Sequence, residues 1–298
     1  MTTVFSNSEA DDDTRRELLY RGQVFVYSAT PASRELVGFA GELIAEAFGG
    51  RDPQTAQFDM PVEEFAALLA DLKPRFIHHP RCKELLPAVL EELGCDLEKT
   101  YFDVPRLRTS TSHDYLTSGI SYAFHPHRDC WYSAPFSQVN WWIPVYAVVP
   151  ENVMAFHPGY FDTAVRNGSA RYDYAEWNRT SRLTAARHVR GDTREQPRPE
   201  EPVQLDPQVR VVPEPGGVLV FSGAQLHSTV PNTSGRTRFS IDFRTVHIDD
   251  VRARRGARNV DAACTGTTLR DFARCADLGP MPEDLALEYE AEALARSR

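Results

Sequence analysis

Three side chains in the second half of the chain have the types and spacing of a metal site. The segment 125–129 reads His-Pro-His-Arg-Asp, and His227 follows the apolar run Val218–Phe221. In an extended chain, residues two apart share a face, so His127 and Asp129 can point at one ion. Two histidines and one carboxylate hold non-haem Fe(II) on one face and leave the remaining positions open. Open positions are what O2 and a chelating 2-oxo acid need.

One neighbouring residue offers an alternative to this assignment. His125 shares the face of His127, so it is either the ligand itself or a group behind the ligands. The His-x-Asp spacing favours His127. The five cysteines are scattered and form no Cys-x-x-Cys pair, so zinc, iron–sulfur and disulfide frameworks are not indicated. An odd, scattered set of cysteines is typical of a reducing cytoplasm, which is the expected location.

The region 101–247 resembles the double-stranded β-helix (jelly-roll) oxygenases that use Fe(II) and 2-oxoglutarate, and within them the phytanoyl-CoA-dioxygenase-like branch. That branch has His-x-Asp, a Pro-Gly turn, a second Pro-Gly turn before an apolar strand, a distal His and then an Arg. The corresponding residues here are His127-Arg128-Asp129, His157-Pro158-Gly159, Pro215–Phe221, His227 and Arg238-Phe239-Ser240. Two features depart from the pattern: Gly217, where the family often has Asp, and the long segment between His157 and Val209.

The resemblance implies three bound species, namely Fe(II), 2-oxoglutarate and O2. His127, Asp129 and His227 would be the iron ligands. Arg238 would bind the distal carboxylate of 2-oxoglutarate through its planar guanidinium, assisted by Ser240 two residues further along the same face. Arg236 is the alternative arginine, but it lies on the turn side and lacks a serine partner. Asn140 and Thr229 are also assigned to the co-substrate site.

A further set of residues is assigned to the substrate, with core packing or a solvated loop as the alternative for each. Aromatic residues flank the metal motif, and arginines and aromatics crowd the long segment after His157. Long irregular insertions are lids, binding loops or disorder, and this content would suit an anionic, ring-bearing substrate such as a nucleotide or another phosphate or carboxylate compound. The residues are Trp131, Tyr132, Trp142, His157, Arg166, Tyr172 and Trp177.

The expected reaction is oxidation of a C–H bond of a small-molecule metabolite. By the same resemblance, Asp129 favours hydroxylation over halogenation, because halogenating relatives have Ala or Gly there and so leave room for chloride. Two other classes stay open. One is a cupin-like metalloenzyme that does not use 2-oxoglutarate, against which Arg238 and Ser240 argue. The other is a non-catalytic jelly-roll binding module, which would not need three metal ligands.

Composition narrows the partners of the chain. Its 298 residues carry a formal net charge of -9, which argues against a nucleic-acid partner. No apolar run approaches the roughly 20 residues of a membrane helix, and the polar start lacks a signal-peptide core. Only three lysines occur beside abundant arginine, a skew typical of a GC-rich bacterial genome and compatible with secondary metabolism. The sequence does not indicate an oligomeric state.

The expected fold is mainly β with flanking helices, a jelly-roll core in a single oxygenase domain. Residues 1–14 are expected to form a disordered tail, 15–100 a helical support, 101–248 the core with an insertion at 160–205, and 249–298 a C-terminal helical segment. Helical spacing predicts helices over 31–48, 61–72, 81–93 and, with a break at Gly279-Pro280, over 268–295. Strands are predicted over 101–109, 120–124, 138–148, 153–156, 209–212, 218–221 and 237–246.

Overall fold

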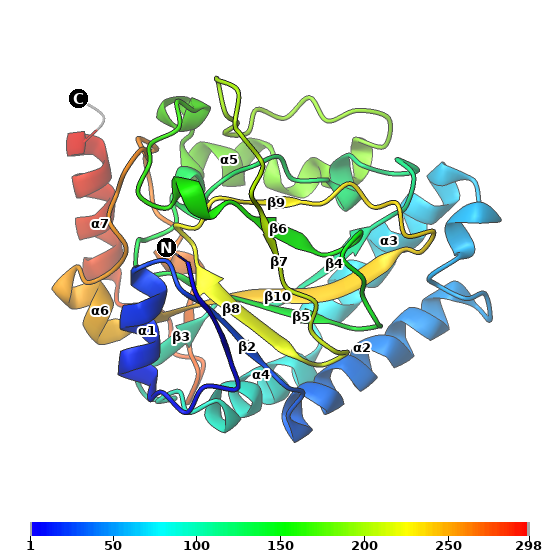
Figure 1. Ribbon diagram of the computed structural model, residues 1–298, viewed down its shortest axis with the longest axis horizontal. Coiled ribbons are helices and arrows are strands. Elements are labelled where there is room, and N and C mark those ends of the chain that lie inside the picture. The colour runs from blue at the N-terminus through cyan, green and yellow to red at the C-terminus, as the bar shows by residue number, and fades with distance from the viewer. Residues whose placement is uncertain (1, 297–298) are drawn as a thin grey trace.

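The computed structural model describes residues 2–296 and has a mixed architecture, with two sheets and with helices toward both ends of the chain (Figure 1). The helices are α1 (Asp12–Tyr20), α2 (Pro31–Phe48), α3 (Val62–Ile77), α4 (Pro80–Glu92), α5 (Tyr174–Thr180), α6 (Ile248–Ala253) and α7 (Glu283–Arg296). The strands are β1 (Val4–Ser6), β2 (Val24–Tyr27), β3 (Thr100–Phe102), β4 (Arg106–Ser110), β5 (Val139–Pro144), β6 (Met154–Phe156), β7 (Val209–Arg210), β8 (Val218–Ser222), β9 (His227–Thr229), β10 (Arg238–His247) and β11 (Ala273–Arg274).

Hydrogen bonding divides the strands of the described residues into two sheets. The large sheet has the order β1-β2-β8-β5-β10-β3-β11, with β4 also paired to β10, and the small one has the order β7-β6-β9. The strand β10 runs antiparallel to both β4 and β5, which sets Arg238 opposite Ser110 and Arg244 opposite Asn140. Figure 1 shows α2 and α4 on one side of the large sheet and the small sheet with α5 on the other. The expected strand core flanked by helices is therefore confirmed.

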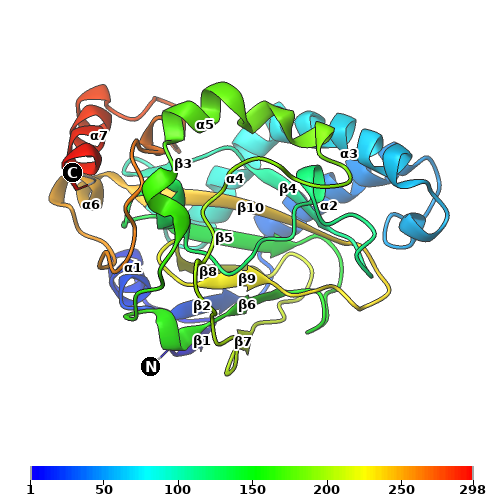
Figure 2. The ribbon, with the colours of Figure 1, turned by 90° about the horizontal axis from the view of Figure 1, so that it is seen from above.

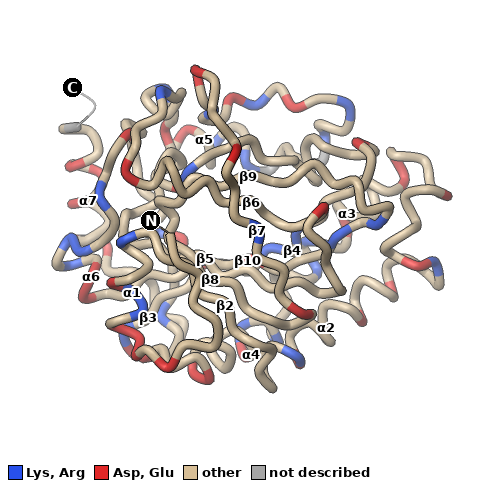
Figure 3. Tube along the Cα trace, viewed as in Figure 1, with Lys and Arg blue, Asp and Glu red and all other residues tan. Residues whose placement is uncertain are grey.

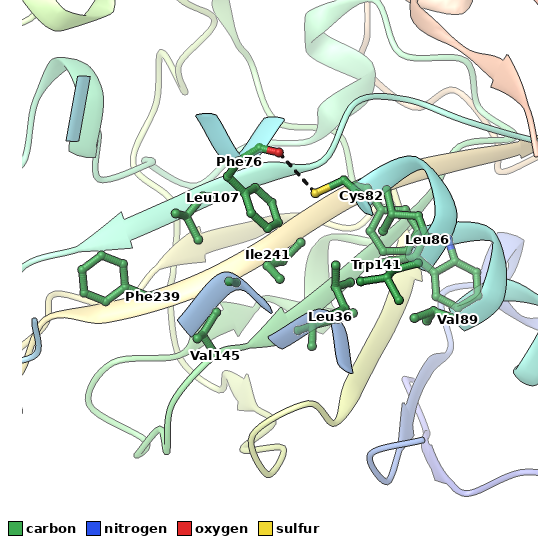
Figure 4. Close-up of a cluster of buried hydrophobic side chains, with 14 of the residues drawn as sticks. Leu36, Phe76, Cys82, Leu86, Val89, Leu107, Trp141, Val145, Phe239 and Ile241 are labelled. Atoms are coloured by element: carbon green, nitrogen blue, oxygen red, sulfur yellow. Dashed lines mark hydrogen bonds between the residues drawn. The ribbon is translucent and has the colours of Figure 1, made fainter. Parts of the chain in front are cut away.

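The two faces of β10 have opposite surroundings, as its alternating sequence predicts. Phe239, Ile241 and Phe243 are fully buried in the largest apolar cluster, with side chains from α2, α3 and α4. Figure 4 shows Ile241 near Phe76 and Leu36 in the middle of this cluster, with Phe239 and Leu86 towards its opposite ends. The polar residues of the strand must point away from the helices, because side chains alternate along a strand. They face the side on which the small sheet lies.

Local signals set the ends of α2 close to their predicted positions, whereas the helix predicted over 268–295 forms only as α7 from Glu283, after a 3-10 turn and the strand β11. Thr30 caps α2 by accepting a hydrogen bond from the backbone N–H of Ser33, Pro31 occupies the first turn, and Gly49 ends the helix in the left-handed region. The helix predicted over 61–72 corresponds to α3, which continues to Ile77, beyond the expected end at Leu72. Figure 2 shows α6 and α7 at one end of the sheets and α2 and α3 towards the other.

The N-terminal region differs from expectation. Residues 1–14 were expected to be a disordered tail, but β1 pairs in parallel with β2, Phe5 stacks on Phe25 at 5.0 Å, and α1 begins at Asp12. The strand β2 in turn pairs with β8 in the large sheet. The expected helical support of 15–100 therefore also contributes the strand β2 to the large sheet. Short strands that gain their stability from a distant partner carry too little local pattern to be predicted.

Two predicted strands were also wrong in detail. The expected strand over 101–109 is two strands, β3 and β4, separated at Asp103–Pro105, where the side chain of Asp103 accepts the backbone N–H of Arg244 at 2.8 Å. The expected strand over 120–124 is a 3-10 turn followed by irregular chain. It begins at Gly119, whose φ of 59° turns the chain away from an extended path.

Two peculiarities of the sequence have structural counterparts. A Cβ on Gly217 would lie 2.9 Å from the carbonyl oxygen of Glu214, so the turn that leads into β8 has little room for a side chain at the position where Asp would have matched the motif. The insertion 160–205 contains α5 and 3-10 turns, without a strand among its described residues. No helix within residues 2–296 is both long and apolar enough to cross a membrane.

Candidate active site

The structure brings His127, Asp129 and His227 together. Their ligand atoms all lie within 4.8 Å of one another, and Asp129 Oδ1 is 3.6 Å from His127 Nε2 and 4.0 Å from His227 Nε2. His127 and His227 form a local antiparallel bridge, with each backbone N–H donating to the other's carbonyl at 2.9 and 3.0 Å. The first histidine is thereby pinned to β9, which carries the second, although the two residues are far apart in sequence.

Backbone contacts orient both imidazole rings. His127 Nδ1 lies 2.8 Å from the carbonyl oxygen of His125, and His227 Nδ1 lies 2.9 Å from that of Gln225. A carbonyl only accepts, so in each ring Nδ1 carries the proton and Nε2 keeps its lone pair. Partners of this kind, on the far nitrogen, fix the tautomer of metal-binding histidines. Both Nε2 atoms therefore face Asp129 as ready ligands.

Asp129 is held in the same way. Its Oδ2 accepts hydrogen bonds from Gln138 Nε2 at 2.8 Å and Asn140 Nδ2 at 2.7 Å, which leaves Oδ1 toward the histidines. Burial would raise the pKa of Asp129, but His227, His127 and the Asn140 amide together hold it below the ordinary value. The carboxylate is consequently ionised at neutral pH, the form that binds a cation.

Burial also sets the charge of the first histidine. It lowers the pKa of His127 to about 3, and the adjacent His227 acts in the same direction. The imidazole is therefore neutral, which is the form that coordinates metals. Two imidazoles and one carboxylate converging from one side match the donor set of a non-haem Fe(II) site. Within the described residues, these three are the group of His, Cys, Asp and Glu placed to hold an ion.

The alternative histidine does not join this group. The side chain of His125 is exposed and packs edge-on against Tyr122, with ring centroids 6.1 Å apart. Its contribution to the triad is its carbonyl oxygen, which orients His127. The structure thus separates the two histidines that the spacing alone left open.

A cavity of about 730 Å³ opens in front of the triad. Its floor comes from β4, β5 and β10, and the insertion adds Tyr172, Tyr174, Trp177 and Arg182 to its wall. Most residues assigned to the co-substrate and substrate line this cavity: Asn140, Thr229, Arg238, Tyr132, Trp142, His157, Tyr172 and Trp177. Its size is that of pockets that enclose small organic ligands.

The far end of the cavity contains polar groups that suit a carboxylate. The guanidinium of Arg238 is buried over the Trp142 ring, 5.5 Å from its centroid, and donates one hydrogen bond to the Asn152 carbonyl at 2.8 Å. Its Nε and the hydroxyl of Ser240 are buried and have no hydrogen-bond partner among the described residues. Buried donors without partners are costly unless a ligand satisfies them. The rival Arg236 is exposed and lies outside the cavity lining.

Three assignments need correction. Trp131 is fully buried and its indole N–H donates to Asp261 at 2.7 Å, away from the cavity. Arg166 lies outside the lining as well, because its side chain donates to the Glu200 carbonyl at 2.7 Å. Asn140 lines the cavity, but its amide oxygen and nitrogen are already engaged by Gln138 and Asp129, so it serves the metal ligand instead.

The other assigned residues differ in whether they keep a group free for a ligand. The hydroxyl of Thr229 accepts the backbone N–H of Phe124 at 3.1 Å and keeps its own proton for a ligand. His157 is fixed between the Ser228 hydroxyl at 2.9 Å and the Leu205 carbonyl at 3.1 Å. Ser240 is fully buried behind the lining, on the same strand face as Arg238.

Several positioning residues could not be found from the motifs. Gln138 supports Asp129, and Gly223 packs beside both, since a Cβ there would lie 3.1 Å from the Gln138 amide nitrogen. Arg128, the middle residue of His-x-Asp, points away from the triad into a buried network with Asp261. No sequence signal marks these contacts, because each joins segments that meet only in the folded chain.

Comparisons with known proteins give structural matches only. No protein-family model matches the sequence, and no curated protein matches it. Among solved structures, the apo form of the non-heme monooxygenase ThoJ is 14% identical, with a TM-score of 0.40 and coverage of 91% of this chain and 90% of ThoJ. The non-heme alpha ketoglutarate dependent carbocyclase SnoK from nogalamycin biosynthesis is 16% identical, with a TM-score of 0.40 and coverage of 80% and 85%. EvdO2 from Micromonospora carbonacea var. aurantiaca, complexed with 2-oxoglutarate, is 14% identical, with a TM-score of 0.36 and coverage of 58% and 62%.

Of these three proteins, SnoK is described as alpha ketoglutarate dependent, EvdO2 was solved with 2-oxoglutarate, and ThoJ is described as a non-heme monooxygenase. At such identities and TM-scores, the function of this chain is inferred from its own side chains.

Proposed function

We propose that this chain is an Fe(II)- and 2-oxoglutarate-dependent oxygenase that oxidises a C–H bond of a small molecule. The observation that carries the proposal is the triad, whose two Nε2 atoms and one carboxylate oxygen are each oriented by a hydrogen bond at their far side. We further propose that the two facing sheets form a double-stranded β-helix core, with the triad and the cavity between them.

In this proposal each residue has a defined task. His127, Asp129 and His227 hold the iron, which with 2-oxoglutarate and O2 supplies the oxidising chemistry. Arg238 and Ser240 bind the distal carboxylate of 2-oxoglutarate, supported by their unsatisfied donors. Thr229 offers a hydroxyl to the same cavity from β9 of the small sheet. Because Asp129 occupies the carboxylate position, hydroxylation, desaturation or ring formation is favoured over halogenation.

The insertion 160–205 is proposed to be the lid of this site. Tyr172 and Trp177 face the cavity, and Tyr132 lies between Tyr172 and the triad, with ring centroids 5.4 Å from Tyr172 and 5.6 Å from His127. An aromatic cover excludes water from the reacting centre. Faster hydrogen exchange of this segment without substrate than with it would support the lid, and equal rates would identify a solvated loop.

The alternatives make different demands on these residues. A cupin-like enzyme without 2-oxoglutarate has no use for the buried, incompletely satisfied Arg238, and a binding module has no use for three oriented ligands. The test is metal content measured after Fe(II) loading and desalting in His127→Ala, His227→Ala and the wild type. The proposal expects one iron per wild-type chain and loss of iron in both variants. Retention of iron by either variant would contradict it.

A further inference from the structure

The wall that β4 and β10 contribute to the cavity carries more positive charge than the protein neutralises. The chain as a whole is acidic, with a net charge of -9. In Figure 3, however, basic residues occur along β4 and β10 in the middle of the molecule. Arg106 and Arg108 of β4 lie opposite Asp242 and Ser240 of β10, so all four side chains share the cavity side of the sheet. An interior excess of cations in an acidic protein calls for an explanation.

One buried carboxylate serves two arginines on this wall. Asp103 accepts hydrogen bonds from Arg244 Nε at 2.5 Å and from Arg106 Nη1 at 2.7 Å. Burial would raise the pKa of Asp103, but the two guanidinium groups hold it below its ordinary value, so it carries a single negative charge. Two cations share that charge. Asp103 therefore compensates only one of these two cations, although Arg244 also interacts with the charges of Asp129 and Asp242.

The two arginines of β4 also keep free donors. Arg106 uses only Nη1 in its hydrogen bonds, to Asp103 and to the Val104 carbonyl at 3.2 Å. Arg108 binds Asp242 through Nε at 2.7 Å and Nη2 at 3.3 Å, so its Nη1 makes no hydrogen bond within residues 2–296. Both residues line the cavity. Their remaining N–H groups are available to an oxyanion, which guanidinium groups bind with strong, directional hydrogen bonds.

These donors lie next to the metal triad. The Arg108 Cζ is 5.4 Å from the centroid of the Phe124 ring, and that ring stacks on the His127 imidazole at 5.0 Å. A single aromatic ring thus separates Arg108 from a metal ligand. On the other side, Arg244 faces Asn140, whose amide holds Asp129. A molecule anchored by its anionic end at β4 would have its neighbouring atoms in front of the metal.

Four arginines of the insertion are already paired with carboxylates of the protein. Arg171 pairs with Glu195 and Glu200, Arg179 with Glu176, and Arg190 with Glu63, all at the surface. Arg182 reaches the cavity but is paired with Asp271 at 3.1 Å. An anionic substrate had been expected from the arginines of this segment. The structure moves that expectation to the opposite wall.

We infer that Arg106 and Arg108 form an oxyanion site for the substrate, which is a small molecule with one carboxylate or phosphate group and a flat apolar body. The apolar body would lie against the aromatic residues that face this wall, Phe124, Tyr132, Tyr172 and Trp177. Arg238 is separate and serves 2-oxoglutarate. The inference rests on the proposed function, because it assigns the second ligand of the same cavity.

The test uses the full-length protein and simple probes. Benzoate and phenyl phosphate carry the two kinds of oxyanion on one ring, and benzamide is the neutral control. Each is titrated calorimetrically, without O2, into protein supplied with Fe(II) and saturating 2-oxoglutarate. The variants are Arg106→Gln/Arg108→Gln and, as a matched surface control, Arg179→Gln. If the double variant unfolds, Arg106→Gln alone replaces it in the test, since this single variant leaves Asp103 paired with Arg244.

We expect the better anion to bind at least about tenfold more tightly than benzamide, because hydrogen bonds to charged groups contribute on this scale. Whichever anion binds better identifies the oxyanion. The Arg106→Gln/Arg108→Gln protein should lose about tenfold to a hundredfold in that affinity, while the Arg179→Gln protein should not change. Equal binding of benzamide and both anions, undiminished anion binding by the arginine variants, or no anion binding to the wild type would each overturn the inference.

A parallel titration of 2-oxoglutarate separates this inference from the proposed function. The double variant should bind 2-oxoglutarate as the wild type does, because Arg238 is intact. If the anions bind through Arg106 and Arg108 but 2-oxoglutarate does not bind at all, the proposed function fails and the oxyanion site stands. If 2-oxoglutarate binds and the anions ignore these arginines, the oxyanion site fails and the proposed function stands.

Discussion

Two buried arginines, Arg128 beneath the metal triad and Arg238 at the end of the cavity, are treated by the fold in opposite ways. Arg128 is fully buried and donates to the Asp261 carboxylate at 3.1 Å and to three carbonyls, those of Ala224, Tyr160 and Thr163, at 2.5 to 2.9 Å. Arg238 is almost as buried, yet it donates only to one carbonyl, and its Nε has no partner within the described residues.

The difference separates a structural cation from a ligand-binding one. Each donor nitrogen of Arg128 is satisfied by the protein, so its contacts tie together the turn after β8, the insertion and the segment at Asp261. The charge of Arg238 is left largely uncompensated, and burial lowers its pKa to about 10. An anion from outside the chain must therefore compensate this charge and accept the remaining hydrogen bonds of Arg238. The same reasoning applies to Arg106, whose carboxylate partner is shared.

The largest effect is expected where the protein itself satisfies the cation. Arg128→Met would leave the buried Asp261 carboxylate without its ion-pair partner and three carbonyls without donors. Breaking a buried pair of this kind lowers the free energy of unfolding by about 3–5 kcal/mol, as measured by chemical denaturation. The exposed Arg179→Gln, which removes a surface pair, should change it by less than about 1 kcal/mol. If both variants lowered the free energy of unfolding by the same small amount, Arg128 would not be the structural cation described above.

The counterpart is Arg238→Gln. Since Arg238 makes only one hydrogen bond in the folded protein, the free energy of unfolding of the variant should equal or exceed that of the wild type. The dissociation constant of 2-oxoglutarate, measured by titration into the Fe(II) protein, should rise about a hundredfold or more, because a buried charge-assisted pair is lost. Iron content should not change. A variant that unfolds more easily but binds 2-oxoglutarate normally would make Arg238 a structural residue, and a loss caused by Arg236→Gln instead would identify the other arginine.

A smaller effect is expected at Asn140, which touches neither arginine but supports the metal ligand. Asn140→Leu removes one of the two amide donors to Asp129 Oδ2 and leaves Gln138 in place. Loss of such a partner lowers metal affinity by about 10–100-fold. Fe(II) binding measured against a competing chelator would show this, with 2-oxoglutarate affinity compared only after metal saturation. Unchanged iron affinity would show that Gln138 alone orients the carboxylate.

An effect that depends on pH is expected at a third buried cation, Lys73 of α3. Its ammonium donates to the Ile120 carbonyl, and burial, with Arg108 nearby, lowers its pKa from 10.5 to about 7. A folded pKa below the unfolded one means that the charged form is disfavoured in the fold. The cost is complete below about pH 7 and disappears as the pH rises toward 10.5.

Lys73→Met should therefore be more stable than the wild type at pH 6, and this advantage should shrink steadily as the pH approaches 10.5. Thermal unfolding of both proteins over this pH range measures the difference. A constant difference at all pH values would mean that Lys73 keeps an ordinary pKa in the folded protein. The positive charge of nearby Arg108 would then be better compensated than its contacts indicate.

Local patterns in the sequence were sufficient for some elements. The alternation along β10, with phenylalanines against helices and polar residues toward the cavity, follows from a period of two and was predicted. The ends of α2 follow from its capping residues. The convergence of His127, Asp129 and His227 was expected from the order and spacing of the motifs, and the structure brings these residues together.

What the sequence could not reveal are contacts whose partners are distant. The strand β1 depends on β2, Asp103 depends on Arg106 and Arg244, and Arg128 depends on Asp261. In each case the residue alone has a more common interpretation, such as a tail, a turn aspartate or an exposed arginine. Trp131 was assigned to the substrate because it flanks the metal motif, although its indole N–H donates a hydrogen bond to Asp261 in the core.

Turnover of 2-oxoglutarate tests the central claim most directly. The wild type, supplied with Fe(II), O2 and ascorbate, should form succinate, slowly without substrate and faster when a pool containing the substrate is added. His227→Ala and Arg238→Gln should each lose this activity, the first through loss of iron and the second through weaker 2-oxoglutarate binding that a higher concentration restores. Succinate formation that persists in His227→Ala, or its absence from a wild type that holds iron at the triad and binds 2-oxoglutarate, would contradict the account.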